Sequence, residues 1–268
     1  MFSSFKLSIT SDFFNGSETN QDIVSKYECD KESIRGKLYE IIYGKDYIDG
    51  TLLQELWFPQ TKSNIFISHS HKDEKLAIQL AGWLWDNFRL RTFIDSSVWE
   101  YADDLIKKLD DDHSIISQDK NNTLYDYSIC HCTCSHVYLM LTNALTKMMD
   151  KTECLIFLNS ENSLSHDEYM KKENTRSPWI YTELELAKMI KRRDLDYYRK
   201  EKWIEHKFAN ESANLDIRYD IDTGDLINID HKDLKDWAGL SKSEFEFPLT
   251  TLYKIKKKEM EKIGVLLG

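Results

Sequence analysis

Short apolar runs alternate with amphipathic segments between residues 64 and 190. IFIS (Ile65–Ser68), RTFID (Arg91–Asp95) and CLIFLNS (Cys154–Ser160) are apolar runs with polar flanks, a pattern typical of buried parallel strands. HKDEKLAIQLAGWLWDNF (His71–Phe88) repeats apolar residues at steps of four, which predicts a helix after the first of these strands. This strand–helix rhythm predicts an α/β fold with a parallel sheet flanked by helices.

Three other segments of the chain do not follow this alternation of strands and helices. Residues 1–60 combine polar loops with helix-like pieces and are predicted to be an N-terminal extension of a main domain over 61–268. Residues 111–136 are polar and rich in Asp, Asn and Ser, so they are predicted to be an insertion, with helical periodicity resuming at Val137. The C-terminal part predicts a hairpin around Thr223–Gly224 and a final basic amphipathic helix.

Composition narrows the class of protein. The chain has 268 residues, and its 41% hydrophobic content allows a sizeable core. A net charge of −10 argues against a dedicated nucleic-acid binder, whose affinity comes from neutralising phosphates. No apolar run approaches the roughly 20 residues of a membrane span, the N-terminus lacks a convincing signal peptide, and the five cysteines are too few for a disulfide scaffold. We therefore expect a cytoplasmic protein without nucleic-acid or membrane partners.

Three of the cysteines occur in CHCTCSH (Cys130–His136), which combines thiol and imidazole groups within seven residues. Structural zinc sites usually join a C-x₂₋₄-C pair to a second, distant pair, and this sequence has no second pair. A zinc site, a redox-active thiol and an ordinary loop or strand with buried thiols stay open, and the spacing favours the last. We expect no bound metal or cofactor.

The segment SPWIYTELELAKMI carries two acids with different surroundings. Ser177 can cap a helix and Pro178 suits its first turn. At about 100° per residue, Glu183 falls within the apolar arc of that helix, whereas Glu185 lies on the opposite side. A carboxylate on an apolar face is costly to desolvate. Glu183 is therefore either a helix-start acid that reaches solvent at the edge of the core or a catalytic residue, and Glu185 is a surface residue.

Several enzyme classes lack their sequence fingerprints. The chain has no G-x-G-x-x-G after a strand, no G-x-x-x-x-G-K-[ST] and no G-x-S-x-G, which argues against a nicotinamide dehydrogenase, a P-loop ATPase and a serine hydrolase. In an open α/β sheet, ligands bind at the carboxyl ends of the strands. The segments Ser68–Glu74, Asp95–Asp104 and Asn159–Glu183 are expected to converge there.

Three motifs in order resemble the Toll/interleukin-1 receptor (TIR) family, in particular its bacterial members. They are IFISHSHKDEKLA, FIDSSVW, and CLIFLNS followed by SPWIYTELELA. Phe66–Ser68 fits the family pattern F-[IL]-S at the end of the first strand, and Trp179 precedes Glu183 by four residues, as in the family's helix after the third strand. The resemblance covers about residues 64–190 and implies a flavodoxin-like fold.

The same resemblance implies cleavage of NAD⁺ as a substrate, with Glu183 as the essential residue. Phe93, Asp95 and Trp99 lie on or beside the family's BB loop, which helps to build a site shared between protomers. At the first strand, serine and histidine replace basic residues that are common in some relatives. The residues implied in substrate binding are Ser68, Ser70, His71, Phe93, Asp95, Trp99 and Trp179.

The resulting expectation is a TIR-type NAD⁺ glycohydrolase or ADP-ribosyl cyclase. Bacterial relatives in anti-phage systems such as Thoeris make an ADP-ribose-derived signal that a separate effector reads, and TIR domains self-associate. Two alternatives remain: a non-catalytic TIR adaptor acting through TIR–TIR assembly, and a flavodoxin-like response or nucleotide-binding module. A glutamate retained on an apolar arc favours the enzyme.

Overall fold

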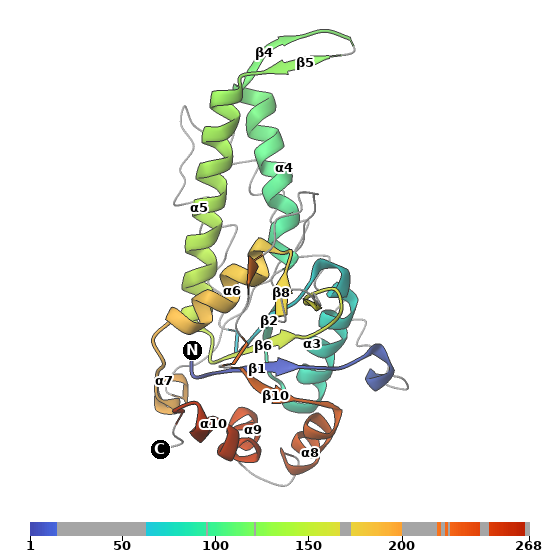
Figure 1. Ribbon diagram of the computed structural model, residues 1–268, viewed down its shortest axis with the longest axis vertical. Coiled ribbons are helices and arrows are strands. Elements are labelled where there is room, and N and C mark those ends of the chain that lie inside the picture. The colour runs from blue at the N-terminus through green and yellow to red at the C-terminus, as the bar shows by residue number, and fades with distance from the viewer. Residues whose placement is uncertain are drawn as a thin grey trace.

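A five-stranded parallel sheet forms the centre of the molecule in the computed structural model, with strand order β10-β1-β6-β2-β3 (Figure 1). Helices cover both of its faces, so the predicted α/β, flavodoxin-like architecture is confirmed. The structure describes residues 1–14, 63–94, 96–120, 122–166, 173–199, 219–220, 223–224, 226–241 and 247–265. The five strands are β1 (Ser3–Leu7), β2 (Ile65–Ser68), β3 (Thr92–Ile94), β6 (Cys154–Leu158) and β10 (Ile227–Ile229).

The first strand of the chain lies inside this sheet. β1 pairs in parallel with β6 on one side and with β10 on the other, so that Phe5 is opposite both Ile156 and Ile227. A flavodoxin-like sheet has the order 2-1-3-4-5. If β2, β3 and β6 are counted as its first three strands, β1 occupies the fourth position. This differs from the prediction, which treated residues 1–60 as an extension of the sheet domain.

Side chains alternate between the two faces of the sheet, as strand geometry requires. In β2, Phe66 belongs to one hydrophobic cluster, whereas Ile65 and Ile67 belong to the other. The first cluster includes residues of the helices α4 (Ser96–His113), α5 (Tyr127–Lys151) and α6 (Pro178–Met189). The second includes residues of the helices α3 (Glu74–Phe88), α8 (His231–Ser241), α9 (Pro248–Ile255) and α10 (Lys257–Lys262).

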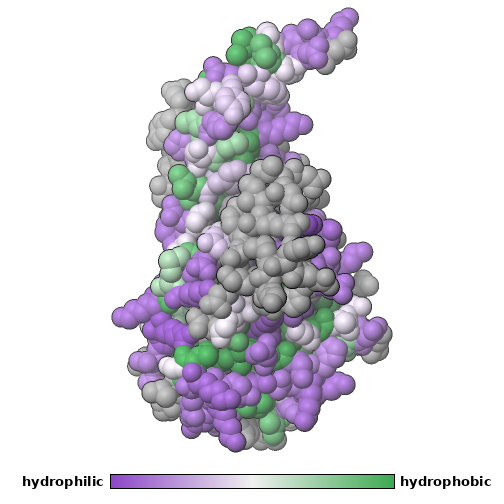
Figure 2. All heavy atoms as spheres, viewed as in Figure 1, coloured by the Kyte–Doolittle hydropathy of each residue, from purple (hydrophilic) through white to green (hydrophobic). Residues whose placement is uncertain are grey.

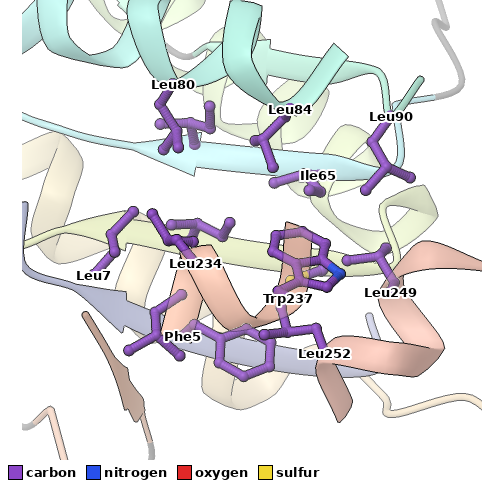
Figure 3. Close-up of a cluster of buried hydrophobic side chains, with 14 of the residues drawn as sticks. Phe5, Leu7, Ile65, Leu80, Leu84, Leu90, Leu234, Trp237, Leu249 and Leu252 are labelled. Atoms are coloured by element: carbon purple, nitrogen blue, oxygen red, sulfur yellow. The ribbon is translucent and has the colours of Figure 1, made fainter. Parts of the chain in front are cut away.

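Figure 3 shows part of the second cluster, between the sheet and the C-terminal helices. Trp237 of α8 is fully buried there and stacks on Phe88 with ring centroids 4.0 Å apart. Its indole N–H donates a hydrogen bond to the carbonyl of Pro248 at 2.8 Å, so the polar group of this large side chain is satisfied. The C-terminal helices therefore pack against the sheet. We call the five-stranded sheet and the helices that cover it the body.

A buried acid fastens two of the peripheral helices to the sheet. Glu153, next to β6, accepts hydrogen bonds from the guanidinium of Arg199 and, at 3.0 Å, from the hydroxyl of Tyr253. Arg199 ends α7 (Leu195–Arg199), and Tyr253 belongs to α9. Charge-assisted bonds to both helices give this carboxylate a structural role.

The helices α4 and α5 extend beyond the sheet as an arm with the strands β4 (Ile115–Gln118) and β5 (Thr123–Tyr125) at its outer end (Figure 1). Apolar residues of α4 pack against Val137 and Leu141 of α5. The predicted insertion at 111–136 thus has regular structure. Asp126 caps α5 by accepting hydrogen bonds from the N–H groups of Ser128 and Ile129. The sequence CHCTCSH lies within α5, so the favoured loop or strand was wrong.

A smaller antiparallel sheet joins β7 (Ser165–His166), β8 (Glu173–Thr175) and β9 (Tyr219–Asp220). Among the described residues, the strands on either side of Thr223–Gly224 do not pair with each other as the predicted hairpin requires, because β9 pairs with β8 while β10 pairs with β1. Short 3-10 helices occur at Ser11–Phe14 and His71–Asp73.

Candidate functional site

The loops that follow β2 and β6 meet at the carboxyl edge of the sheet. Asp73 accepts a hydrogen bond from the Ser160 hydroxyl at 2.5 Å and another from the Asn162 side-chain amide at 2.8 Å. Asp73 itself is only 8% exposed. Two of the three segments predicted to converge at this edge are therefore joined by direct contacts.

The loop after β6 is fixed further by its own hydrogen bonds. The Ser163 hydroxyl accepts from the Ser160 N–H at 2.8 Å and donates to the Leu158 carbonyl at 2.9 Å. The Asn159 side chain donates to the Ser8 hydroxyl at 2.9 Å, just beyond the end of β1. These contacts hold the ends of β1, β2 and β6 in a defined arrangement, as a preorganised site requires.

The predicted substrate-binding residues at β2 have different environments. Ser68 is fully buried at the end of the strand, and its hydroxyl has no hydrogen-bond partner among the described residues. Ser70 is partly exposed and His71 is exposed. Of these three predicted residues, Ser70 and His71 are therefore the ones accessible from solvent.

The helix α6 begins as the sequence predicts. The Ser177 hydroxyl accepts a hydrogen bond from the Ile180 N–H at 3.3 Å, and Pro178 occupies the first turn. Three residues past the helix C-terminal cap, the Arg193 N–H donates to the Met1 carbonyl, next to the start of β1. Since this end of the helix lies near the amino edge of the sheet, α6 runs back from the carboxyl edge, and its first turns lie closest to the loops described above.

The two glutamates of α6 are placed as the helical arc predicts. Glu183 is fully buried, and its neighbours Ile180 and Leu184 belong to the cluster that covers the sheet. Glu185 has a side chain that is 35% exposed and forms a 3.0 Å ion pair with Lys188. The interpretation of Glu183 as an acid that reaches solvent past the edge of the core is thus wrong. The carboxylate lies inside the molecule, where charge–charge and charge–dipole interactions are stronger than in water.

Trp179 connects this helix to the base of the arm. Its ring lies 5.8 Å from that of Tyr138 in α5, and the Tyr138 hydroxyl donates to the Asp103 carboxylate of α4 at 3.3 Å. Burial raises the pKa of Asp103; the hydrogen bond from Tyr138 lowers it, and the nearby Asp104 raises it further. Trp179 is partly buried against the core cluster, which agrees with a packing role and leaves part of its ring accessible.

The remaining predicted residues follow β3. Phe93 is 3% exposed and packs against Phe66 with ring centroids 5.3 Å apart, so it is a core residue. The physical reason is the strand alternation that turns Phe93 toward the same core as Phe66. Asp95 lies outside the described residues, as does the side chain of Trp99 within α4.

A separate cleft of about 470 Å³ lies beyond β10, lined by residues of β10, α8 and α10. Lys256 is paired there with Asp233 at 2.7 Å, and the remaining charged lining residues are Asp230, Glu259 and Lys262, so acids outnumber lysines by one. Backbone hydrogen bonds, first from Asp233, lower the pKa of Asp230. A pyrophosphate would meet this negative charge, so the cleft is a poor match for a dinucleotide. Glu183 and the loops after β2 and β6 do not line it.

The cysteine-rich segment contributes no metal centre within the described part of the chain, where no group of three or more His, Cys, Asp or Glu residues is placed to hold an ion. Cys130 and Cys134 are partly buried, and Cys132 is exposed. Burial raises the pKa of the Cys130 and Cys134 thiols, which makes them weaker nucleophiles. In the described residues, none of the helices is both long and apolar enough to cross a bilayer.

Helical spacing identified Glu183 as a candidate, whereas the polar cluster of Asp73, Ser160 and Asn162 was not predicted. The available signal was weak, because each residue is an ordinary polar loop residue and only the topology brings them together. No protein-family model matches the chain, and neither a curated protein nor a solved structure matches it significantly. The functional assignment therefore rests on the residues and on the geometry of this site.

Proposed function

We propose that the chain is a TIR-type NAD⁺ glycohydrolase or ADP-ribosyl cyclase that breaks the bond between nicotinamide and ribose, with Glu183 as its catalytic carboxylate. The observation that carries the proposal is the complete burial of Glu183 on the apolar face of a capped helix that starts at the carboxyl edge of the sheet. Burying a carboxylate at such a position carries a desolvation cost, and a role for Glu183 in the reaction would account for it.

One carboxylate is enough for this reaction. The nicotinamide ring of NAD⁺ carries a positive charge and leaves as a neutral molecule, so its departure needs no general acid, unlike the oxygen leaving group of an ordinary glycoside. Positive charge then develops at the anomeric carbon of the ribose. A fixed anion in a sheltered site stabilises that charge and can hold a ribose hydroxyl. Glu183 supplies the anion, and the apolar surroundings of α6 limit screening by water.

The polar loops supply the second requirement, a rigid place for the rest of the dinucleotide. Ser160 and Asn162 are held by Asp73, and Ser70 and His71 lie on the accessible side of the same edge. Their hydroxyl, amide and imidazole groups can form hydrogen bonds with ribose and phosphate oxygens. In this proposal Ser70 and His71 bind substrate, Asp73 is a positioning residue, and Trp179 packs beside the carboxylate and stacks on a ring.

The biological role follows from the family resemblance. An ADP-ribose-derived product would act as a signal in bacterial anti-phage defence and would be read by a separate effector. Residues after β3 would complete the site of a second protomer. Hydrolysis and cyclisation share the first bond cleavage and differ in what attacks the ribosyl cation afterwards, so product analysis has to distinguish them.

A non-catalytic TIR adaptor is the second candidate, because the apolar outer end of the arm offers a surface for assembly. The two functions are separated by incubating the purified chain with NAD⁺ over a range of protein concentrations and following nicotinamide and ribosyl products by mass spectrometry. The enzyme releases nicotinamide in proportion to time together with ADP-ribose, its cyclic form or a conjugate. Nicotinamide release no faster than the spontaneous rate at every concentration would favour the adaptor.

A further inference from the structure

One row of residues crosses the sheet close to its carboxyl edge. The register of β2, β6, β1 and β10 places four residues side by side in this row: Ser68, Phe157, Lys6 and Asn228. Register partners on neighbouring strands point to the same face of a sheet. Because Phe157 belongs to the hydrophobic cluster that includes residues of α6, all four side chains lie on the face that α6 covers.

The polar residues of this row differ in their exposure to solvent. Asn228, on the edge strand β10, is exposed, and Lys6 in β1 is 9% exposed. Ser68 in β2 is fully buried, and its hydroxyl has no hydrogen-bond partner among the described residues. The row therefore leads from solvent at β10 to a buried polar group at β2, with a lysine between them.

Lys6 and Glu183 lie at the same end of the layer between the sheet and α6. The Arg193 N–H donates to the Met1 carbonyl at 3.2 Å, so the chain just after α6 lies beside the start of β1. From the helix cap at Ile190 back to Glu183 the helix rises about 10 Å. From Met1 to Lys6 the extended chain rises about 16 Å in the same direction. A buried acid and a largely buried lysine thus lie toward the carboxyl edge on one face.

Positive charge at this place meets a requirement of a phosphate-bearing ligand. Hydrophilic residues cover much of the body's surface that Figure 2 shows in colour, and the chain's net charge of −10 repels phosphate at long range. Lys72, in the loop after β2, is exposed, so water and salt screen its charge. The charge of Lys6 acts where the effective dielectric constant is lower, and its attraction for a phosphate is stronger there.

We propose that Lys6 binds the pyrophosphate of the substrate while Glu183 holds the nicotinamide ribose. This inference rests on the proposed function, because it assigns a further substrate contact in the same site. The ammonium group donates charge-assisted hydrogen bonds to phosphate oxygens, and the hydroxyl of Ser68 in the same row is a second donor. The strand at the N-terminus of the chain thereby supplies the cation, while α6 supplies the anion.

This role of Lys6 predicts which kinetic constant it controls. Bond cleavage changes the charge on the ribose and the nicotinamide, whereas the charge of the pyrophosphate stays the same. An interaction with the pyrophosphate is therefore equally strong in the ground state and in the transition state, so its loss raises KM and leaves kcat unchanged. Nicotinamide riboside has no phosphate, and its cleavage should not depend on Lys6.

Steady-state kinetics of the full chain with NAD⁺ and with nicotinamide riboside test the inference. Lys6→Met should raise the KM for NAD⁺ roughly tenfold or more, because a charge-assisted hydrogen bond is lost, and should leave both kcat and the cleavage of nicotinamide riboside unchanged. Lys256→Met is the matched control. It replaces an equally buried lysine in the cleft beyond β10 and should not change the KM for NAD⁺. Thermal unfolding shows that both variants are folded.

Calorimetric titration with ADP-ribose separates this inference from the proposed function, because ADP-ribose has the pyrophosphate but no nicotinamide bond to break. Lys6→Met should weaken its binding roughly tenfold or more. If the chain binds ADP-ribose through Lys6 but never cleaves NAD⁺, the proposed function is wrong and the inference holds. If NAD⁺ is cleaved with a KM that Lys6→Met does not change, the inference is wrong and the function holds. A chain that neither binds ADP-ribose nor cleaves NAD⁺ contradicts both.

Chemical protection tests the same contact in the unmodified chain and does not depend on how a variant folds. Acetic anhydride acetylates lysine side chains, and peptide mass spectrometry gives the rate at each one. Saturating ADP-ribose should slow the acetylation of Lys6 several-fold and leave that of Lys256, which is equally buried, unchanged. Acetylation of Lys6 at the same rate with and without ADP-ribose would overturn the inference.

Discussion

The core around α6 and the outer face of α5 depart from the usual pattern of burial in opposite directions. The core contains Glu183, a charged residue with no exposed surface, whereas α5 exposes Leu139 and Ile129 to water. Burying a carboxylate is costly and so is exposing apolar area. The comparison therefore singles out one feature in each region: a buried acid in the core, for which we propose a catalytic role, and exposed apolar side chains on the arm.

The two regions also differ in how much packing supports them. The sheet is covered by a cluster on each face, while the described residues of the arm pack mainly as α4 against α5 and β4 against β5. Elements with fewer buried contacts open at lower free energy than the core. The arm should consequently unfold locally before the sheet, and substitutions in the two regions should have very different effects on global stability.

The largest loss of stability is expected for a substitution in the sheet. Phe157 in β6 is fully buried, and Phe157→Ala should lower the free energy of unfolding by about 3–5 kcal/mol through lost burial and a remaining cavity. Leu124→Ala, at a residue 57% exposed on β5, should change it by less than about 0.5 kcal/mol. Denaturant titrations measure both values. Similar losses for the two variants would show that the arm and the sheet share one core.

Replacing residues 111–136 with a short Gly-Ser linker should have a smaller effect on the body. The replacement removes β4, β5 and the outer turns of both helices, but it keeps Leu105, Leu109, Val137 and Leu141, which belong to the hydrophobic cluster that covers the sheet. The remaining chain should unfold cooperatively. Loss of the cooperative transition would mean that the arm belongs to the body's core.

The smallest expected effect is a difference in the rates at which the cysteine thiols react. Cys132 is exposed, whereas burial raises the pKa of Cys134, so Cys132 should react first with iodoacetamide. Cys154 is buried in β6 with a pKa raised by burial and should react only after unfolding. Mass spectrometry of the alkylated peptides gives the order in which the cysteines react. If Cys132 is as slow as Cys154 even in dilute monomeric protein, the outer face of α5 is not exposed as described.

Local patterns predicted the elements whose apolar residues repeat within one segment. The strands β2, β3 and β6 and the helices α3 and α6 were found in this way. β1 was missed because SSFKL contains only two large apolar residues and gains its place by pairing with strands far along the chain. The start of α5 was missed because residues such as Ser, Thr and Cys favour a helix only weakly, and the Asp126 cap compensates.

In the candidate site, too, local patterns predicted some features, while contacts between distant segments were missed. Helical spacing alone separated Glu183 from Glu185, because direction around a helix is a local property. The contacts of Asp73 with Ser160 and Asn162 join residues almost 90 positions apart, and the pattern of either segment does not specify them. Phe93 was assigned to substrate by resemblance, yet the alternation of its strand turns it into the core.

The central claim is tested most directly by comparing the two glutamates of α6 in an NAD⁺ turnover assay. Glu183→Gln keeps the shape of the side chain and removes the charge that stabilises the ribosyl cation, so nicotinamide release should fall by roughly 10²-fold or more. Glu185→Gln removes only an exposed ion pair with Lys188 and should retain full activity. Thermal unfolding of both variants confirms that they are folded. Turnover by Glu183→Gln equal to that of the unmodified chain would contradict the account.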